Sequence, residues 1–236
     1  MENLLSGAEL DEFGEQVVRE YLGEREVKCL DIEEFIRSYL KLPIFYESIA
    51  EKEIEKIGFI ADGRTPLWVI GKDGPEQRIY SAGCIVIDKY LLNETELGRR
   101  RFTLAHEAAH YLLDRMKPTP KASFSQEYNP SREYTPEELR SQFRLPEWQA
   151  DTLGSIILMP SNLVKKALEV WNEGKPIPVF GQNFLSYDSK MKLRGMAYRL
   201  GVSRKALMIR LRKLGLLEYR DLSEYIRKDL GLGGVK

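Results

Sequence analysis

The segment that most constrains the fold is His106-Glu107-Ala108-Ala109-His110, which contains both histidines of the chain. On a helix, positions i and i+4 lie one turn apart, with Cβ atoms about 5–6 Å from each other. Two imidazoles at this spacing can bind one Zn²⁺ ion at about 2.0–2.1 Å, an arrangement typical of zinc-dependent hydrolases. Apolar residues around the motif recur mostly at spacings of three and four, which predicts a helix with one buried side: Phe102, Ala105, Ala109, Leu112, Leu113 and Met116.

Glu107 lies between the two histidines and is rotated about 100° from His106 around the helix axis. Its carboxylate can therefore point beside the metal, where a bound water would sit and where a general base is needed. The simpler alternative is that two core or surface histidines lie four residues apart by coincidence. Histidine is rare here, with two among 236 residues, and both belong to this motif. We therefore favour a metal site.

A catalytic zinc ion needs a third protein ligand. No histidine remains, and the two cysteines precede the motif without metal-ligand spacing, so a downstream carboxylate is expected. The best candidate segment is 146–160, where prolines near both ends bracket a predicted helix. Glu147 would complete a His₂Glu ligand set, and Asp151, on the same face, could accept the second N–H of a ligating histidine, which we expect to be His106. The alternative is that Glu147 and Asp151 form an ordinary solvated acidic face. Because the His-Glu-x-x-His motif lies upstream, we favour the ligand interpretation.

Three stretches resemble the ImmA/IrrE family of metallopeptidases: residues 101–107 with His110, residues 147–160, and a C-terminal segment described below. The resemblance extends from the first helix to about Leu217. The family's second helix usually reads Glu-x-x-Ala-Asn/Asp-x-Phe-Ala, which assigns the ligand to Glu147 and the polar partner to Asp151. The chain differs by having Leu153-Gly154 in place of Phe-Ala, at positions that pack rather than bind.

The resemblance implies an α+β fold of the zincin type, in which a small antiparallel sheet precedes the active-site helix. It also implies a Zn²⁺ cofactor and a narrow protein substrate, commonly a helix-turn-helix repressor whose cleavage switches on stress or mobile-element genes. We expect a zincin-like metallopeptidase domain over residues 1–175. A helical region packed on it is expected over residues 176–236.

The local patterns agree with this fold. Two amphipathic helices are expected before residue 43, the first opened by a Ser6–Glu9 capping box and the second capped by Asp31. Asp62-Gly63 and Asp73-Gly74 are hairpin signals between segments rich in β-branched or aromatic residues. The predicted strands are 44–46, 58–61, 67–70, 78–80 and 84–87.

Residues 117–146 contain five of the eleven prolines and form a long connection, which predicts a flap, a lid or a partly disordered segment. Tyr128 and Tyr134 lie in it. A tyrosine, arginine or lysine would be needed if a side chain assists the metal in stabilising the oxyanion, and the sequence does not select one.

Charge is unevenly distributed although the net charge is zero. Residues 1–55 carry 15 acidic and 6 basic side chains, whereas residues 190–213 carry 9 basic and no acidic ones. Around Gly201-Val202-Ser203 the pattern predicts two helices joined by a turn, which is a helix-turn-helix. Its charge would suit DNA phosphates, but the resembling family has a similar segment as part of its fold, so a helical hairpin packed on the peptidase is favoured.

The remaining composition indicates a soluble, cytoplasmic protein. The two cysteines form no disulfide framework, residues 1–6 do not open a signal peptide, and no run of about 18 apolar residues predicts a membrane span. The interpretation is a zinc endopeptidase in which His106, His110 and Glu147 hold the metal and Glu107 is the general base. One rival is a DNA-binding regulator that uses residues 190–217 and keeps the zinc site as a relic. Another is a zinc hydrolase that acts on a non-peptide amide and differs only in its substrate.

Overall fold

The computed structural model describes residues 5–50, 57–115, 123–125 and 145–228. They form two compact units that divide between Pro160 and Ser161, N-terminal to the boundary at 175 expected from the sequence. The fold is α+β, as predicted. Within the described ranges, no helix is both long and apolar enough to cross a membrane.

The first unit begins with a helical layer made of α1 (Gly7–Leu22), α2 (Ile32–Glu34) and the π-helical turn η1 (Phe35–Tyr39). The predicted capping box is present: the Ser6 hydroxyl accepts from the Glu9 N–H, and the Glu9 carboxylate accepts from the Ser6 N–H. Asp31 caps α2 by accepting backbone N–H groups. The buried side of α1 includes Leu10, Val17 and Val18, so this layer packs inward through the periodicity expected from the sequence.

A four-stranded sheet follows, with strand order β1-β5-β2-β6: β1 (Ile44–Glu47), β5 (Ile85–Asp88), β2 (Gly58–Ile60) and β6 (Ser123–Ser125). The strands β5, β2 and β6 are antiparallel, but β1 pairs with β5 in parallel, so the sheet is mixed rather than fully antiparallel. Most of the predicted flap, residues 117–146, lies outside the described residues; the described parts are β6 and residues 145–146, which begin the helix α5 (Leu145–Leu158).

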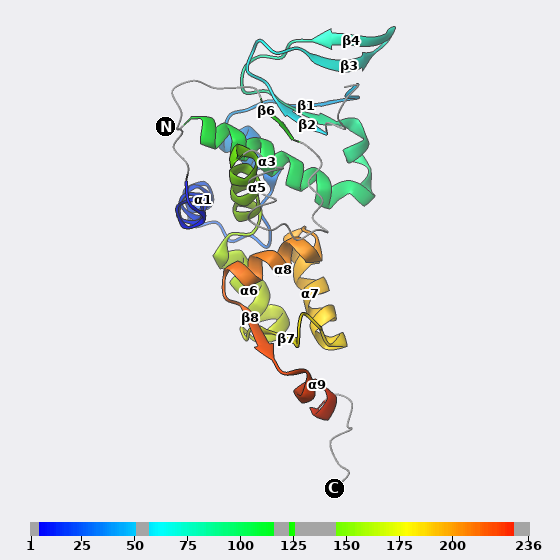
Figure 1. Cartoon of the computed structure of the whole chain (residues 1–236). Helices are drawn as coiled ribbons and strands as arrows, with labels where there is room; N and C mark the ends of the chain where they lie inside the picture. Colours follow the sequence, from blue (N-terminus) through cyan, green and yellow to red (C-terminus); the bar gives the residue numbers. More distant parts are fainter. Residues whose placement is uncertain (1–4, 51–56, 116–122, 126–144, 229–236) are drawn as a thin grey trace. The chain divides into compact units, whose positions relative to one another are not determined.

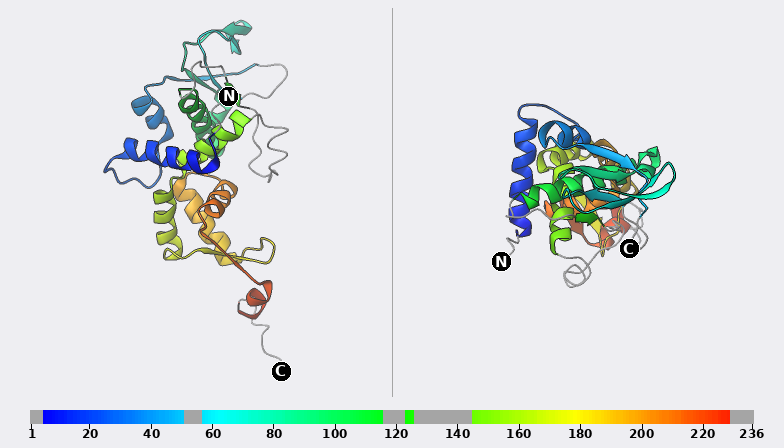
Figure 2. Two further views of the ribbon diagram at one scale, coloured as in Figure 1. Left: turned by 60° about the vertical axis from the view of Figure 1, so that its left-hand side comes forward. Right: turned by 90° about the horizontal axis from the view of Figure 1, so that it is seen from above.

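A separate hairpin consists of β3 (Leu67–Gly71) and β4 (Gly74–Arg78). The sheet lies between this hairpin and the long helix α3 (Figures 1 and 2). The Asp73-Gly74 hairpin is confirmed, because Gly71 pairs with Gly74 across the turn. The other turn signal was misread: β2 and β3 belong to different sheets, and the Asp62 carboxylate instead accepts the N–H groups of Arg64 and Thr65.

Two short 3₁₀ turns, η2 (Lys89–Leu92) and η3 (Glu94–Glu96), lead into α3 (Leu97–Asp114). This helix lies against β2 and β5, and α5 (Leu145–Leu158) packs along α3 (Figure 1). The apolar side predicted around the histidine motif is confirmed in part: Ala105, Ala109 and Leu113 are buried, whereas Phe102 and Leu112 are half-buried and Met116 lies outside the described residues. Leu104 and Ala108, which were not predicted, are also fully buried. The helix that carries the motif is therefore held between the sheet and α5.

Two glycines allow α5 to lie close to α3 and to α1: Gly154 on α5 and Gly14 on α1. A Cβ on Gly154 would lie 3.1 Å from the backbone carbonyl of Ala105 and from the amide nitrogen of His106. On α1, a Cβ on Gly14 would lie 2.6 Å from the Ile156 side chain. Since interiors are close-packed, side chains at these positions would force the helices apart. Gly154 therefore sets the distance between α5 and the histidine motif.

The second unit contains α6 (Ser161–Asn172), β7 (Ile177–Phe180), α7 (Tyr187–Leu200), α8 (Arg204–Lys213), β8 (Leu217–Arg220) and α9 (Leu222–Lys228). The two predicted helices and the turn between them are confirmed: Gly201 ends α7 with φ 64° and ψ 39°, and the Ser203 hydroxyl caps α8. The parallel pair of β7 and β8 was not predicted, because Pro178 lies within a strand of four residues in a segment that reads as a loop.

We expect Gly154→Val to destabilise the first unit by about 2 kcal/mol or more, because the added methyl groups meet helix backbone that cannot give way. Gly98→Val is the matched control, since Gly98 is an exposed α3 residue with no atom within 4 Å of its Cβ position. Urea unfolding followed by circular dichroism measures both variants. Equal stability of the two would show that the α3–α5 approach is not constrained at Gly154.

Candidate metal centre

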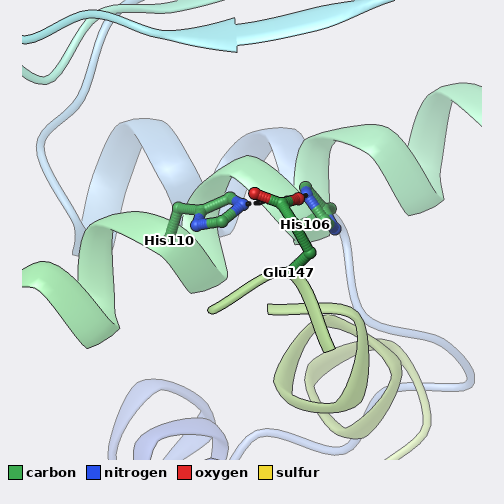
Figure 3. A group of neighbouring side chains, drawn as sticks. All are labelled: His106, His110 and Glu147. Carbon is green, nitrogen blue, oxygen red and sulfur yellow. Dashed lines mark hydrogen bonds and ion pairs between the residues drawn. The ribbon is translucent and has the colours of Figure 1, made fainter. Parts of the chain in front are cut away.

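Two adjacent helices bring three ligand-type side chains together in the first unit. His106 and His110 project from successive turns of α3, and Glu147 reaches them from the first turn of α5 (Figure 3). The two Nε2 atoms are 2.9 Å apart, and Glu147 Oε2 lies 3.3 Å from Nε2 of His106 and 3.4 Å from that of His110. One nitrogen from each ring and one carboxylate oxygen thus face a common point.

The spacing of these three atoms suits a tetrahedral metal ion. With metal–ligand bonds of about 2.0–2.1 Å, two ligands of a tetrahedral zinc ion lie about 3.3 Å from each other. The three observed separations span 2.9–3.4 Å. Both imidazoles are buried, at 4% and 3% exposure, whereas the Glu147 side chain is 22% exposed. The donor set therefore fits a metal with three protein ligands, and the carboxylate side is the one that retains access to solvent.

Asp151 contacts the opposite side of the His106 ring. Its Oδ1 lies 2.8 Å from His106 Nδ1, and it comes from the same face of α5 as Glu147, one turn later. When the imidazole is neutral and donates Nδ1–H to this carboxylate, the lone pair of Nε2 is directed at the cluster. Asp151 therefore selects the tautomer that a metal ligand requires.

The electrostatics of the cluster favour a cation. Burial lowers the pKa of His106, but hydrogen bonds to Asp151 and Glu147 outweigh burial and raise this pKa to about 10. Burial raises the pKa of Glu147, yet the two histidines outweigh it and lower this pKa to about 2. A positive charge is thus stabilised among these groups. In the chain without metal a proton supplies it, and the same donor atoms can bind a divalent ion in its place.

Glu107 is completely buried, and its charge acts on His106 by raising the pKa of the imidazole. A buried carboxylate costs free energy unless a positive charge lies nearby. A cation held by the two histidines would provide that charge. The Glu107 carboxylate therefore lies on the helix that carries both histidines, where a bound metal ion would compensate its negative charge.

The sequence identified the side chains of this cluster but not what sets their distance. Among the described residues, His106, His110 and Glu147 are the group able to hold a metal, and neither free cysteine belongs to it. Tyr128 and Tyr134 lie outside the described residues. Gly154 was expected to pack rather than bind, and it does, against the backbone of Ala105 and His106; which residues it packs against was not predicted. The available signal was Ala150 and Gly154, two small residues one turn apart on α5.

Comparison with known families accounts for this arrangement. A family model described as Peptidase_M78, IrrE N-terminal-like domain, matches residues 38–212. The chain belongs to this peptidase family. The resemblance drawn from the sequence motifs is thereby confirmed. The matched residues of this M78 member include α3 and α5, which carry the His-His-Glu cluster. No curated protein matches the chain.

For this M78 member we expect Asp151→Asn to weaken metal binding by about 10–100-fold, because the amide no longer stabilises the Nδ1–H tautomer of His106 as a carboxylate does. Titration against a fluorescent zinc chelator measures the affinity. Asp188→Asn is the control, because this substitution makes the same chemical change at an exposed position of α7. Wild-type affinity in Asp151→Asn would contradict the orienting role.

Proposed function

We propose that the chain is a zinc-dependent endopeptidase. The observation that carries this proposal is the convergence of two Nε2 atoms and one carboxylate oxygen beside a buried glutamate, in a member of a peptidase family. His106, His110 and Glu147 would hold the ion, and Asp151 would hold His106 in orientation. An ion in this set would leave one position of a tetrahedron open, as catalytic zinc sites require.

When bound, Zn²⁺ supplies Lewis-acid polarisation of the scissile carbonyl and lowers the pKa of a water molecule to about 7. Glu107 would accept the proton that this water loses as it attacks the carbonyl carbon. The same carboxyl group would then deliver the proton to the nitrogen of the leaving amine. Proton transfer by a positioned side chain is typically worth about 10²–10⁴-fold in rate.

For the substrate, we propose a helix-turn-helix transcriptional repressor, so that cleavage would release stress or mobile-element genes. This assignment rests on the resemblance to the ImmA/IrrE family. The rival function, a DNA-binding regulator with a relic zinc site, is less well supported. A relic has no need of a ligand set with close spacing, an oriented imidazole and an enclosed glutamate, and all three are present here.

We expect Glu107→Gln to retain zinc but to lose about 10²–10⁴-fold in cleavage rate, because the amide cannot accept the proton. The assay is co-expression with a repressor encoded beside this gene, followed by detection of its fragments, with zinc content measured on the purified chain. Glu169→Gln, an exposed α6 change, is the control.

Fragments formed at the wild-type rate by Glu107→Gln would remove the general-base role. An intact repressor with zinc-loaded wild-type chain would reject the proposed substrate but not the metal site. Because zinc content is read separately, failure of the ligand set can be distinguished from both of these results.

A further inference from the structure

The two units of the chain carry opposite net charge. Residues 161–236 have 16 Lys and Arg against 7 Asp and Glu, a net charge of +9, and residues 1–160 have 20 against 29, a net charge of −9. The excess of the second unit is concentrated in residues 190–213, where 9 basic side chains occur without an acidic one. This stretch covers most of α7, the turn and all of α8. The proposed peptidase chemistry uses none of it.

The buried and exposed sides of α8 differ in chemistry. Leu207, Arg210 and Leu211 are buried. At about 100° per residue the opposite side of the helix passes through Lys205, Ile209 and Arg212. The exposed basic residues of α8 are Arg204, Lys205, Arg212 and Lys213, which we call the α8 cations. They form two pairs, one at each end of the helix.

The separation of the two pairs matches a feature of duplex DNA. Eight residues of α-helix span about 12 Å at about 1.5 Å per residue, and this is the distance along α8 from the first pair to the second. The major groove of B-DNA is about 12 Å wide, with phosphates along both rims. In a helix-turn-helix the second helix enters that groove. In this chain Gly201 ends α7 in the αL conformation and Ser203 caps α8, so the two helices are joined by a short turn, as in that motif.

We propose that α8 binds the phosphate backbone of duplex DNA through the α8 cations, largely independently of base sequence. Between the two pairs, the middle of the helix presents Met208 and Ile209, which are half-buried and offer no hydrogen-bonding group for base edges. The cations can therefore neutralise phosphates, whereas the middle of the helix reads little sequence. Such a contact would hold the chain on DNA, and it does not depend on the metal centre.

The test is fluorescence anisotropy of a labelled 20-base-pair duplex of arbitrary sequence with the full chain, measured from 50 to 200 mM salt. Four phosphate contacts predict a log–log salt slope of about −3.6, so binding should weaken about 100-fold over this range. In Arg204→Gln/Lys205→Gln the slope should fall in magnitude by about 2, and the affinity by at least about 10-fold at 100 mM salt.

The control is Lys165→Gln/Lys166→Gln, which removes the same two charges from exposed positions of α6 in the same unit. It should change the affinity by less than about 3-fold, and thermal unfolding should show that both double variants remain folded. Equal losses in the two double variants would overturn the proposal, because only bulk charge would then matter. No binding at 50 mM salt, or tighter binding of single-stranded RNA, would also overturn it.

A second copy of the chain is the competing occupant, because its acidic first unit also complements the α8 cations. Sedimentation velocity at 50 mM salt distinguishes the two cases. A monomer that binds duplex DNA supports the proposal. Self-association that the duplex does not compete with, and that Arg204→Gln/Lys205→Gln abolishes, would overturn it.

Discussion

The metal centre depends on how closely α5 can lie against α3. The two histidines lie on one helix, so their mutual distance follows from helical geometry alone. Glu147 and Asp151 come from a different helix, separated in the sequence by a long connection, and reach the imidazoles only because Gly154 lets α5 contact the backbone of Ala105 and His106. Packing between two helices thus determines whether three ligand atoms face one point or remain apart.

The chemistry of the centre follows from burial. His106, His110 and Glu107 are buried side chains of α3, and uncompensated charge is costly at buried positions. Two carboxylates beside His106 raise the pKa of the imidazole, and two imidazoles beside Glu147 lower the pKa of the carboxyl group. Both shifts have one cause, the preference of this cluster for a positive charge. A divalent ion satisfies that preference and also provides the electrophile that peptide hydrolysis needs.

The sequence predicted the helices and the histidine motif because these depend on local spacing, as in the Ser6–Glu9 capping box and the apolar side of α3. The sequence was less informative about β-strands, because the pairing of a strand depends on residues distant in the chain. Residues 78–80 have strand-forming side chains, yet β4 ends at Arg78 because its partner β3 begins at Leu67. The β7 strand was missed because its partner lies forty residues away. The contact of Gly154 is likewise invisible without the facing helix.

The account is tested most directly by X-ray diffraction from crystals of the full chain, purified without chelators, with data collected above and below the zinc absorption edge. It predicts one anomalous difference peak that appears above the edge, coordinated by Nε2 of His106, Nε2 of His110 and the carboxylate of Glu147. An absent peak in crystals soaked with zinc, or a zinc ion bound elsewhere while these three side chains contact only one another, would contradict it.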